Sequence, residues 1–512
     1  MDLPLIIQGG MGAGVSNWRL AQAVSSTGEL GVVSGVALDV ILSRRLQDGD
    51  PGGHMRLALQ NFPFPQMAQR VLDQHFIPGG KAKDAPYKLV PMHSMNTPRV
   101  LVELTICAHF SEVWLARQGH SNAVGINFLE KIQLPHLFAM YGAMLAGVDY
   151  VLMGAGIPLK VPGVLDALAN HEAASYPIYV AGAQDGDETH VHFNPRDYME
   201  RELPPLKRPK FLAIIASNTL ATTMMRKANG RVDGFVIEGP TAGGHNAPPR
   251  GKLQMDETGE PIYGERDVVD LEKMRAMGVP FWLAGGYGSP EMVQHALEQG
   301  ATGVQVGTPF SMCKESGYAP ELRSAMLQVA HGGSARVKTD MLASPTGFPF
   351  KVAQLENTLS QEDVYIQRAR ICDVGQLREA YRTEDGRIAF RCAAEPLNNY
   401  LAKGGKTEAA EGRKCLCNSL LSNIGLCQVQ KNGYVERAMV TVGNDIVGVS
   451  RFSPLGEDYS AADVIRVLRS GIEDQSHAGD TVSANLAAGY TPTHPEDSTQ
   501  TLVCASASGA RF

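Results

Sequence analysis

One histidine, His245, follows an apolar run that ends in a glycine-rich turn. The segment runs Phe235-Val236-Ile237-Glu238-Gly239-Pro240-Thr241-Ala242-Gly243-Gly244-His245. An imidazole acts as a general base near neutral pH without a large shift of its pKa. A surface histidine that only forms hydrogen bonds is the alternative, but the position beyond a strand end and a Gly-Gly turn favours catalysis. We therefore predict that His245 is catalytic.

Two further apolar runs, about 22 residues apart, end in glycines. The first ends in Ala284-Gly285-Gly286 and the second in Gly307-Thr308. Backbone without side chains lets amide donors approach an anion, and a threonine adds a hydroxyl group. Either loop alone is also explained as an ordinary tight turn. Together, at neighbouring strand ends, they predict a phosphate site.

The chain begins with a third glycine-rich loop, which holds Gly10 and Met11. Its sequence is Gln8-Gly9-Gly10-Met11-Gly12-Ala13-Gly14. Glycine permits close approach of the backbone to a flat ligand. The loop is not a dinucleotide fingerprint, because no acidic residue follows at the usual distance after a second strand. Asn127 ends another run, Gly125-Ile126-Asn127, where its amide can pair with a cofactor ring or cap a turn.

Eight short apolar runs alternate with helical stretches over the first 330 residues. They are Leu5–Gln8, Gly31–Ser34, Ala123–Asn127, Asp149–Met153, Phe211–Ile215, Asp233–Ile237, Pro280–Ala284 and Gly303–Val306. Strands that alternate with helices are typical of a parallel sheet. We predict an α/β fold, a (β/α)8 TIM-type barrel with inserted loops and a C-terminal Cys-containing extension. The alternation by itself also permits a doubly wound open sheet.

Apolar spacing of three and four predicts helices between these strands. The clearest are Pro135–Ala146, Ser217–Lys227, Leu271–Met277 and Pro290–Gln299. Val100–Thr105 is expected to be an additional extended segment. Ile178–Ala181 is expected to pair with His190–Phe193 as a hairpin above the barrel.

The chain divides into three parts. Residues 1–355 are expected to form the barrel, with insertions at about 36–98, 182–208 and 240–266. Residues 356–472 form a Cys-containing region that packs on the barrel. It is expected to hold an extended pair, Tyr434–Val442 and Ile446–Phe452, and a helix from Ser460 with Asp463 at its third position. Residues 473–512 are rich in Ser, Thr, His, Ala and Pro, which predicts a disordered tail.

Five of the eight cysteines lie between Cys372 and Cys427. Cys372, Cys392, Cys415 and Cys417 supply enough thiolates for zinc or an iron–sulfur cluster, with Cys427 nearby. The spacing of Cys415 and Cys417 is shorter than in usual zinc knuckles, and the other two are isolated. We predict buried, reduced, structural cysteines and no metal.

The composition excludes several classes of protein. A formal net charge of −7 and a pI of about 6.1 give no basis for binding nucleic acid or an anionic membrane through bulk charge. No apolar run reaches the roughly 18 residues of a membrane span. The N-terminus lacks the pattern of a signal peptide, and the cysteines form no disulfide framework. We therefore expect a cytoplasmic protein.

Taken together, these motifs resemble the nitronate monooxygenase (2-nitropropane dioxygenase) family. The resemblance rests on the Gln-Gly-Gly-Met opening, Gly125-Ile126-Asn127, Glu238-Gly239, Ala242-Gly243-Gly244-His245, Ala284-Gly285-Gly286 and Gln305-Val306-Gly307-Thr308. It covers roughly residues 3–350. The long insertions and the region after the barrel are similar to the long bacterial branch related to FMN-dependent enoyl-acyl-carrier-protein reductases.

The resemblance implies flavin mononucleotide (FMN) as cofactor and a role for each matching residue. Gly10 and Met11 would face the flavin through their backbone, and Asn127 would contact it. Gly243, Gly285, Gly286, Gly307 and Thr308 would hold the ribityl and phosphate portion. His245 would take a proton beside a nitro group or assist protonation in a reductase.

Three functions fit this resemblance. The first is FMN-dependent oxidation of alkyl nitronates or related carbanions with oxygen, by a nitronate monooxygenase-type enzyme. The second is reduction of an enoyl thioester, with NAD(P)H as electron donor and an acyl carrier protein or synthase as partner. The third is a non-catalytic flavin-binding subunit.

Overall fold

Eight parallel strands form a closed barrel in the computed structural model, which describes residues 3–184, 186–454 and 456–472. The barrel strands are β1 (Ile6–Gln8), β2 (Gly31–Ser34), β3 (Val124–Leu129), β4 (Tyr150–Gly154), β8 (Lys210–Ile215), β9 (Gly234–Glu238), β11 (Phe281–Ala284) and β12 (Gly303–Val306). Their order in the sheet is β1-β12-β11-β9-β8-β4-β3-β2. All eight predicted strands are confirmed, with bounds close to those expected.

The barrel closes between β1 and β2. The Gln8 amide donates to the Leu30 carbonyl at 2.9 Å, and the Leu30 amide donates to the Ile6 carbonyl at 3.1 Å. An open doubly wound sheet would leave these two edges unpaired, so that alternative is excluded. Inside the barrel, Ile7, Val32 and Trp282 belong to a small buried cluster that is separate from the larger core. Such filling by side chains is usual in this fold, which is a packed core and not a pore.

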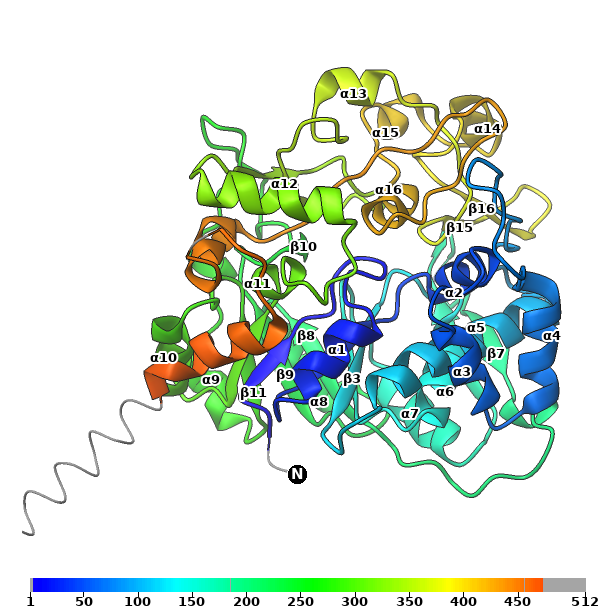
Figure 1. Ribbon diagram of the computed structural model, residues 1–512, viewed down its shortest axis with the longest axis horizontal. Helices are drawn as coiled ribbons and strands as arrows, with labels where there is room; N and C mark the ends of the chain where they lie inside the picture. The colour runs from blue at the N-terminus through cyan, green and yellow to red at the C-terminus, as the bar shows by residue number, and fades with distance from the viewer. Residues whose placement is uncertain (1–2, 185, 455, 473–512) are drawn as a thin grey trace, which may run out of the picture.

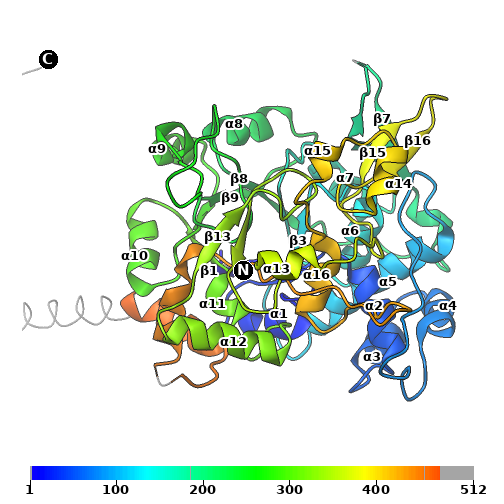
Figure 2. The same cartoon turned by 90° about the horizontal axis from the view of Figure 1, so that it is seen from above.

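Helices cover the outside of the barrel (Figures 1 and 2). They include α1 (Trp18–Ser25), α5 (Arg99–Ala116), α6 (His136–Leu145), α7 (Val161–Ala169), α8 (Asn218–Lys227), α9 (Leu271–Ala276), α10 (Pro290–Glu298), α11 (Thr308–Ser311) and α12 (Pro320–His331). The four helices named from the sequence are confirmed as α6, α8, α9 and α10. Two of them have serine N-caps, since Ser217 and Ser289 accept backbone hydrogen bonds from Leu220 and Met292.

The expectation that Val100–Thr105 is extended is wrong, because this segment lies inside α5. Nearly every residue of this helix is buried, and it packs against α1, α2 (Leu38–Gln47), α3 (His54–Gln60), α4 (Pro65–His75) and α6. A helix that is apolar all round shows no helical period in its sequence. Tertiary packing therefore decides its conformation.

The expected hairpin is only partly correct. β7 (Thr189–Phe193) does pair antiparallel, but with β5 (Ala174–Ile178). β6 (Val180–Ala181) pairs instead with β15 (Glu379–Arg382), in parallel. The β5–β7 pair contacts α6, so it packs on the helical layer and not above the barrel.

Most of the region after the barrel lies over the carboxyl ends of the strands, as the yellow segments of Figure 1 show, whereas its last helix, over 461–472, lies beside α10. The elements of this region not yet named are α13 (Glu362–Ile366), β16 (Ile388–Arg391), α14 (Leu397–Ala402), α15 (Thr407–Ala410), α16 (Leu416–Asn423), η3 (Asn444–Phe452) and a helix over 461–472. The small elements that precede it are η1 (Pro195–Asp197), β10 (Gly244–His245), η2 (Glu265–Asp267), β13 (Val337–Asp340) and β14 (Phe350–Ala353).

The pair expected over Tyr434–Val442 and Ile446–Phe452 is wrong. The first segment makes only isolated bridges, and the second is largely η3, which packs on α11 and α12. Val440, Val442, Ile446 and Val449 are nevertheless buried, so these side chains do not need a partner strand. The capped helix is confirmed, since the Ser460 amide donates to Asp463 at 2.9 Å. The predicted tail lies outside the described residues.

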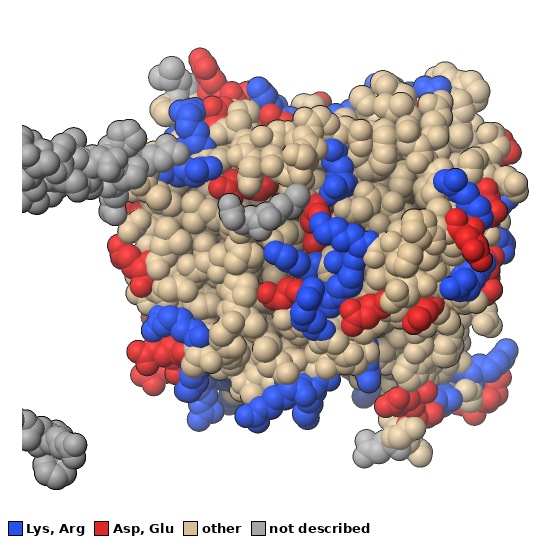
Figure 3. Space-filling model, turned by 90° about the horizontal axis from the view of Figure 1, so that it is seen from below, with Lys and Arg blue, Asp and Glu red and all other residues tan. Residues whose placement is uncertain are grey.

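Opposite charges alternate on the face opposite the region after the barrel (Figure 3). Asp149, for example, pairs with both Arg117 and Lys207, and Arg208 pairs with Asp166 and Asp233. In the part of the chain that the structure describes, no helix combines the length and apolar character needed to cross a membrane.

Candidate functional site

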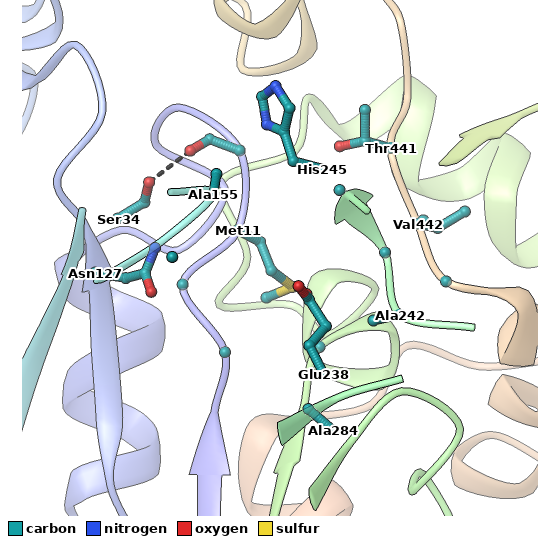
Figure 4. Close-up of a pocket in the computed structure, with 18 of the residues that line it drawn as sticks. Met11, Ser34, Asn127, Ala155, Glu238, Ala242, His245, Ala284, Thr441 and Val442 are labelled. Atoms are coloured by element: carbon teal, nitrogen blue, oxygen red, sulfur yellow. Dashed lines mark hydrogen bonds between the residues drawn. The ribbon is translucent and has the colours of Figure 1, made fainter. Parts of the chain in front are cut away.

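All nine residues predicted for the site line one cavity of about 190 Å³, the first cavity, at the carboxyl ends of the barrel strands (Figure 4). They are Gly10, Met11, Asn127, Gly243, His245, Gly285, Gly286, Gly307 and Thr308. Because parallel strands bring their carboxyl ends to the same rim, loops far apart in the sequence meet there. The structure thus assembles the predicted set without leaving a member out.

One end of the first cavity is a glycine cradle formed by Gly285, Gly286, Gly307 and Thr308. Gly285 and Gly286 have φ of 92° and 81°, which favours glycine. A Cβ added to Gly285 would lie 3.0 Å from the Ala242 amide nitrogen. The glycines of the cradle thus present bare backbone to the cavity, which suits the binding of an anion.

The hydroxyl of Thr308 is engaged by the region after the barrel. It accepts a hydrogen bond from the Gly443 amide at 2.9 Å and also bonds to Asp445. Burial raises the pKa of Asp445, which favours a neutral carboxyl beside the cradle. Gly443 and Asp445 could not be selected from local patterns, because both lie more than a hundred positions beyond Thr308.

Gly10 and Met11 lie in the loop after β1, next to the cradle, since a Cβ on Gly307 would lie 3.5 Å from Met11 Sδ. A Cβ on Gly10 would come within 2.4 Å of the Asn127 Cβ, so only glycine fits there. The Met11 amide donates to Ser16 Oγ, and its carbonyl accepts from the Ser16 amide. The polar groups of the Met11 backbone thus bond within their own loop, and its side chain faces the cavity (Figure 4). The expectation that Met11 faces the flavin through its backbone stays a prediction.

His245 lies at the other end of the cavity, on β10. This short strand pairs with β14, which places the ring at 4.5 Å and 71° against Phe350. His245 Nε2 lies 3.1 Å from Ser344 Oγ. Burial, with a smaller contribution from Lys131, lowers the pKa of His245 to about 4. The expectation of a base with an almost unshifted pKa is therefore corrected: the imidazole is neutral at pH 7 but weakly basic.

Glu238, the last residue of β9, also lines the cavity, and the sequence analysis did not select it. Burial raises its pKa to about 8, and it forms no hydrogen bond with another described residue. Its side chain extends toward Met11 (Figure 4). Two groups of one site with pKa values shifted in opposite directions are typical of an acid and a base in the same reaction. The position of Glu238 at the end of a strand could have marked it as a site residue in the sequence.

Gln305 is a second lining residue that was missed. Its Oε1 is buried and has no partner among the described residues. A buried amide oxygen without a partner is costly, so a donor from a ligand would satisfy it.

Four cysteines of the region after the barrel lie near one another. Cys392 and Cys415 are buried together, and Cys417 packs against them. Burial raises the pKa of Cys372, Cys392 and Cys415 to about 12 each, so these thiols are protonated at neutral pH. Among the described residues, no three His, Cys, Asp or Glu side chains are arranged to hold a metal. The prediction of reduced structural cysteines remains a prediction.

Comparison with known proteins gives matches over part of the chain. Residues 193–341 match the family model "Nitronate monooxygenase". A "Probable nitronate monooxygenase" of Bacillus subtilis is 31% identical over 133 residues, which are 25% of this chain and 36% of that protein. A "Nitronate monooxygenase" of Pseudomonas aeruginosa is 30% identical over 160 residues, 31% of this chain and 42% of that protein. The matches thus span less than half the length of these relatives.

Solved structures align over most of the chain at low scores. FabK from Thermotoga maritima gives a TM-score of 0.47 and 16% identity, over 94% of this chain and 96% of that one. Nitroalkane oxidase from Streptomyces ansochromogenes gives a TM-score of 0.45 and 13% identity, over 93% of this chain and 97% of that one. The fold assignment rests on the strand order and closure of this chain itself.

The segment that matches the family model contains most of the predicted site. It includes Gly243, His245 and the whole glycine cradle. These matches confirm the predicted resemblance of this chain to the nitronate monooxygenase family.

Proposed function

We propose that this protein is an FMN-dependent oxidoreductase of the nitronate monooxygenase type, which oxidises alkyl nitronates or related carbanions with oxygen. One observation carries the proposal: His245 and the glycine cradle line the same cavity, within the segment that matches the family model. The cavity therefore has a proton-transfer group at one end and an anion-binding loop pair at the other.

The residues of the first cavity fit FMN. The glycine cradle would hold the phosphate, because bulkier residues would fill that space. Gln305 and Asn127 would contact the polar edge of the ring, which gives the buried Gln305 Oε1 a donor. Bound flavin would supply the redox chemistry, accepting an electron pair from substrate and passing it to oxygen.

His245 would act on a neutral nitroalkane as the base. The carbon–hydrogen bond beside the nitro group breaks, the proton goes to an imidazole nitrogen, and the electron pair stays on the substrate as the nitronate. The contact with Ser344 Oγ orients the ring, and Phe350 fixes its plane. Glu238 would remain neutral at pH 7 and so would not repel the nitronate anion.

Reduction of an enoyl thioester by NAD(P)H is the second candidate. A second cavity adjoins the first and shares Gln376 and Leu377 with it. This additional space exceeds what a small nitroalkane needs and favours a longer ligand.

Anaerobic stopped-flow spectroscopy of the flavin-loaded protein separates the two. Bleaching of the flavin by an alkyl nitronate, and not by NADH or NADPH, supports the monooxygenase. Rapid bleaching by a nicotinamide nucleotide supports the reductase. Release of FAD instead of FMN on denaturation, seen by mass spectrometry, would disprove the cofactor assignment.

A further inference from the structure

The second cavity, of about 350 Å³, lies between the barrel and the region after it. The barrel contributes the loop after β3, with Glu130 and Lys131, and the region after the barrel contributes residues from Gln376 to Arg413. Gln376 and Leu377 also line the first cavity. The two cavities are therefore adjacent.

Cationic side chains outnumber carboxylates on the wall of the second cavity. Lys131, Arg378, Arg391 and Arg413 face Glu130 and Glu379. Glu379 is neutralised by Arg391, at 2.9 Å. Burial raises the pKa of Glu130, and the neighbouring charge of Lys131 opposes part of that shift.

Three of the cations have no carboxylate partner in the described part of the chain. Arg378 donates to the carbonyls of Gly375 and His93, and Arg413 donates to those of Ala409, Met341 and Ser344. Neutral carbonyls orient a guanidinium group but do not cancel its charge.

Lys131 Nζ lies 4.6 Å from the centre of the Phe348 ring and makes no ion pair with any described residue. An enclosed surplus of positive charge attracts anions more strongly than the same charges would on an open surface.

Phe348 connects this charge to the site of chemistry. Its ring lies between Lys131 and His245, with its centre 6.5 Å from that of the His245 ring. The charge of Lys131 is also close enough to affect the titration of His245. A ligand whose reactive carbon lies beside His245 would thus reach Lys131 with its next few groups.

We propose that the second cavity is a phosphate-binding subsite, in which Lys131 contacts a phosphate carried by the distal part of a ligand that reaches His245. The inference rests on the proposed function in one respect, that the first cavity is the place of reaction, and the two ligands named next belong to the second candidate, reduction of an enoyl thioester by NAD(P)H. Two ligands carry a phosphate in this way: a nicotinamide dinucleotide and a 4′-phosphopantetheine thioester.

Calorimetric titration of the flavin-loaded protein tests the subsite without turnover. One arm compares nicotinamide mononucleotide, the phosphorylated nicotinamide half of the dinucleotide, with nicotinamide riboside, and the other compares crotonyl-4′-phosphopantetheine with crotonyl-pantetheine. In one arm, the phosphate should strengthen binding about tenfold or more, the scale of one charged hydrogen bond. The arm that shows the effect identifies the source of the phosphate.

Substitutions of Lys131 locate the contact. Lys131→Gln should abolish most of the preference for the phosphorylated ligand, and Lys131→Arg should retain it. Lys83→Gln, on an exposed lysine outside both cavities, is the matched control and should keep the wild-type preference.

Equal affinity for both members of each pair in the wild type, or an unchanged preference in Lys131→Gln, would overturn the subsite. Flavin bleaching is measured separately. A protein that prefers the phosphorylated ligand but whose flavin is bleached by no substrate would instead disprove the proposed function.

Discussion

The two ends of the first cavity differ in whether backbone or side chains form them. The glycine cradle consists largely of backbone, where Gly285 and Gly286 adopt positive φ and a Cβ on Gly285 would lie 3.0 Å from the Ala242 amide nitrogen. The end at His245 consists of side chains, held by Ser344 and Phe350 from another part of the chain. Backbone loops suit a ligand that stays bound, whereas side chains with shifted pKa values suit a reaction. Substitutions at the two ends should therefore have separable effects.

The largest effect is expected at His245. His245→Asn removes the base but keeps a polar group of similar kind, so turnover of a neutral nitroalkane should fall by about 100-fold or more. Oxidation of a preformed nitronate, which needs no deprotonation, should fall less. FMN content should remain that of the wild type, measured by absorbance after denaturation. His295→Asn, on an exposed histidine of α10, is the control. Wild-type rates with intact flavin would remove His245 from the mechanism.

A substitution in the glycine cradle should weaken the binding of FMN. Gly286→Leu should weaken FMN affinity by about tenfold or more, because the side chain occupies the space of the ligand. Gly259→Leu is a matched control, since Gly259 also has φ of 81° but no atoms near its Cβ position. Fluorescence titration with FMN measures both. Equal losses in the two variants would attribute the effect to backbone strain and not to the cradle.

A smaller effect, on the pH profile, is expected at Glu238. The pKa near 8 means that its carboxyl is neutral below this pH and negative above it. With a nitronate anion as substrate, kcat/KM should fall by up to about tenfold as the pH rises through 8, because the new charge repels the substrate. Glu238→Gln remains neutral, so its profile should stay flat there. A fall of equal size in the variant would assign the titration to another group.

The smallest effect is expected away from both ends, at the cysteines. Cys415→Ser with Cys417→Ser should not change the metal content, because the wild type is predicted to hold reduced thiols without metal. Elemental analysis of protein purified without chelators measures this. Stoichiometric zinc or iron in the wild type, lost in the double variant, would show that the prediction is wrong.

Local sequence patterns were sufficient to predict site residues where these residues directly follow a strand. The eight barrel strands are short apolar runs that end in glycine-rich turns, and parallel strands with helical connections place those ends on one rim. His245 and the glycines could therefore be selected before the fold was known. Glu238 could have been selected in the same way, since it ends β9.

Other features depend on contacts between distant segments, which leave no local trace. Val100–Thr105 is helical because other helices surround it on all sides. Gly443 bonds to Thr308 across 135 positions, and Ser344 reaches His245 across 99.

The sequence by itself determined the barrel, its rim and the residue types that meet there. The tertiary structure alone decided their ionisation, because burial lowers the pKa of His245 to about 4 and raises that of Glu238 to about 8. It also decided that the region after the barrel closes the site and adds the second cavity. The reason is physical: strand formation follows from neighbouring residues, whereas desolvation depends on every segment that packs around a group.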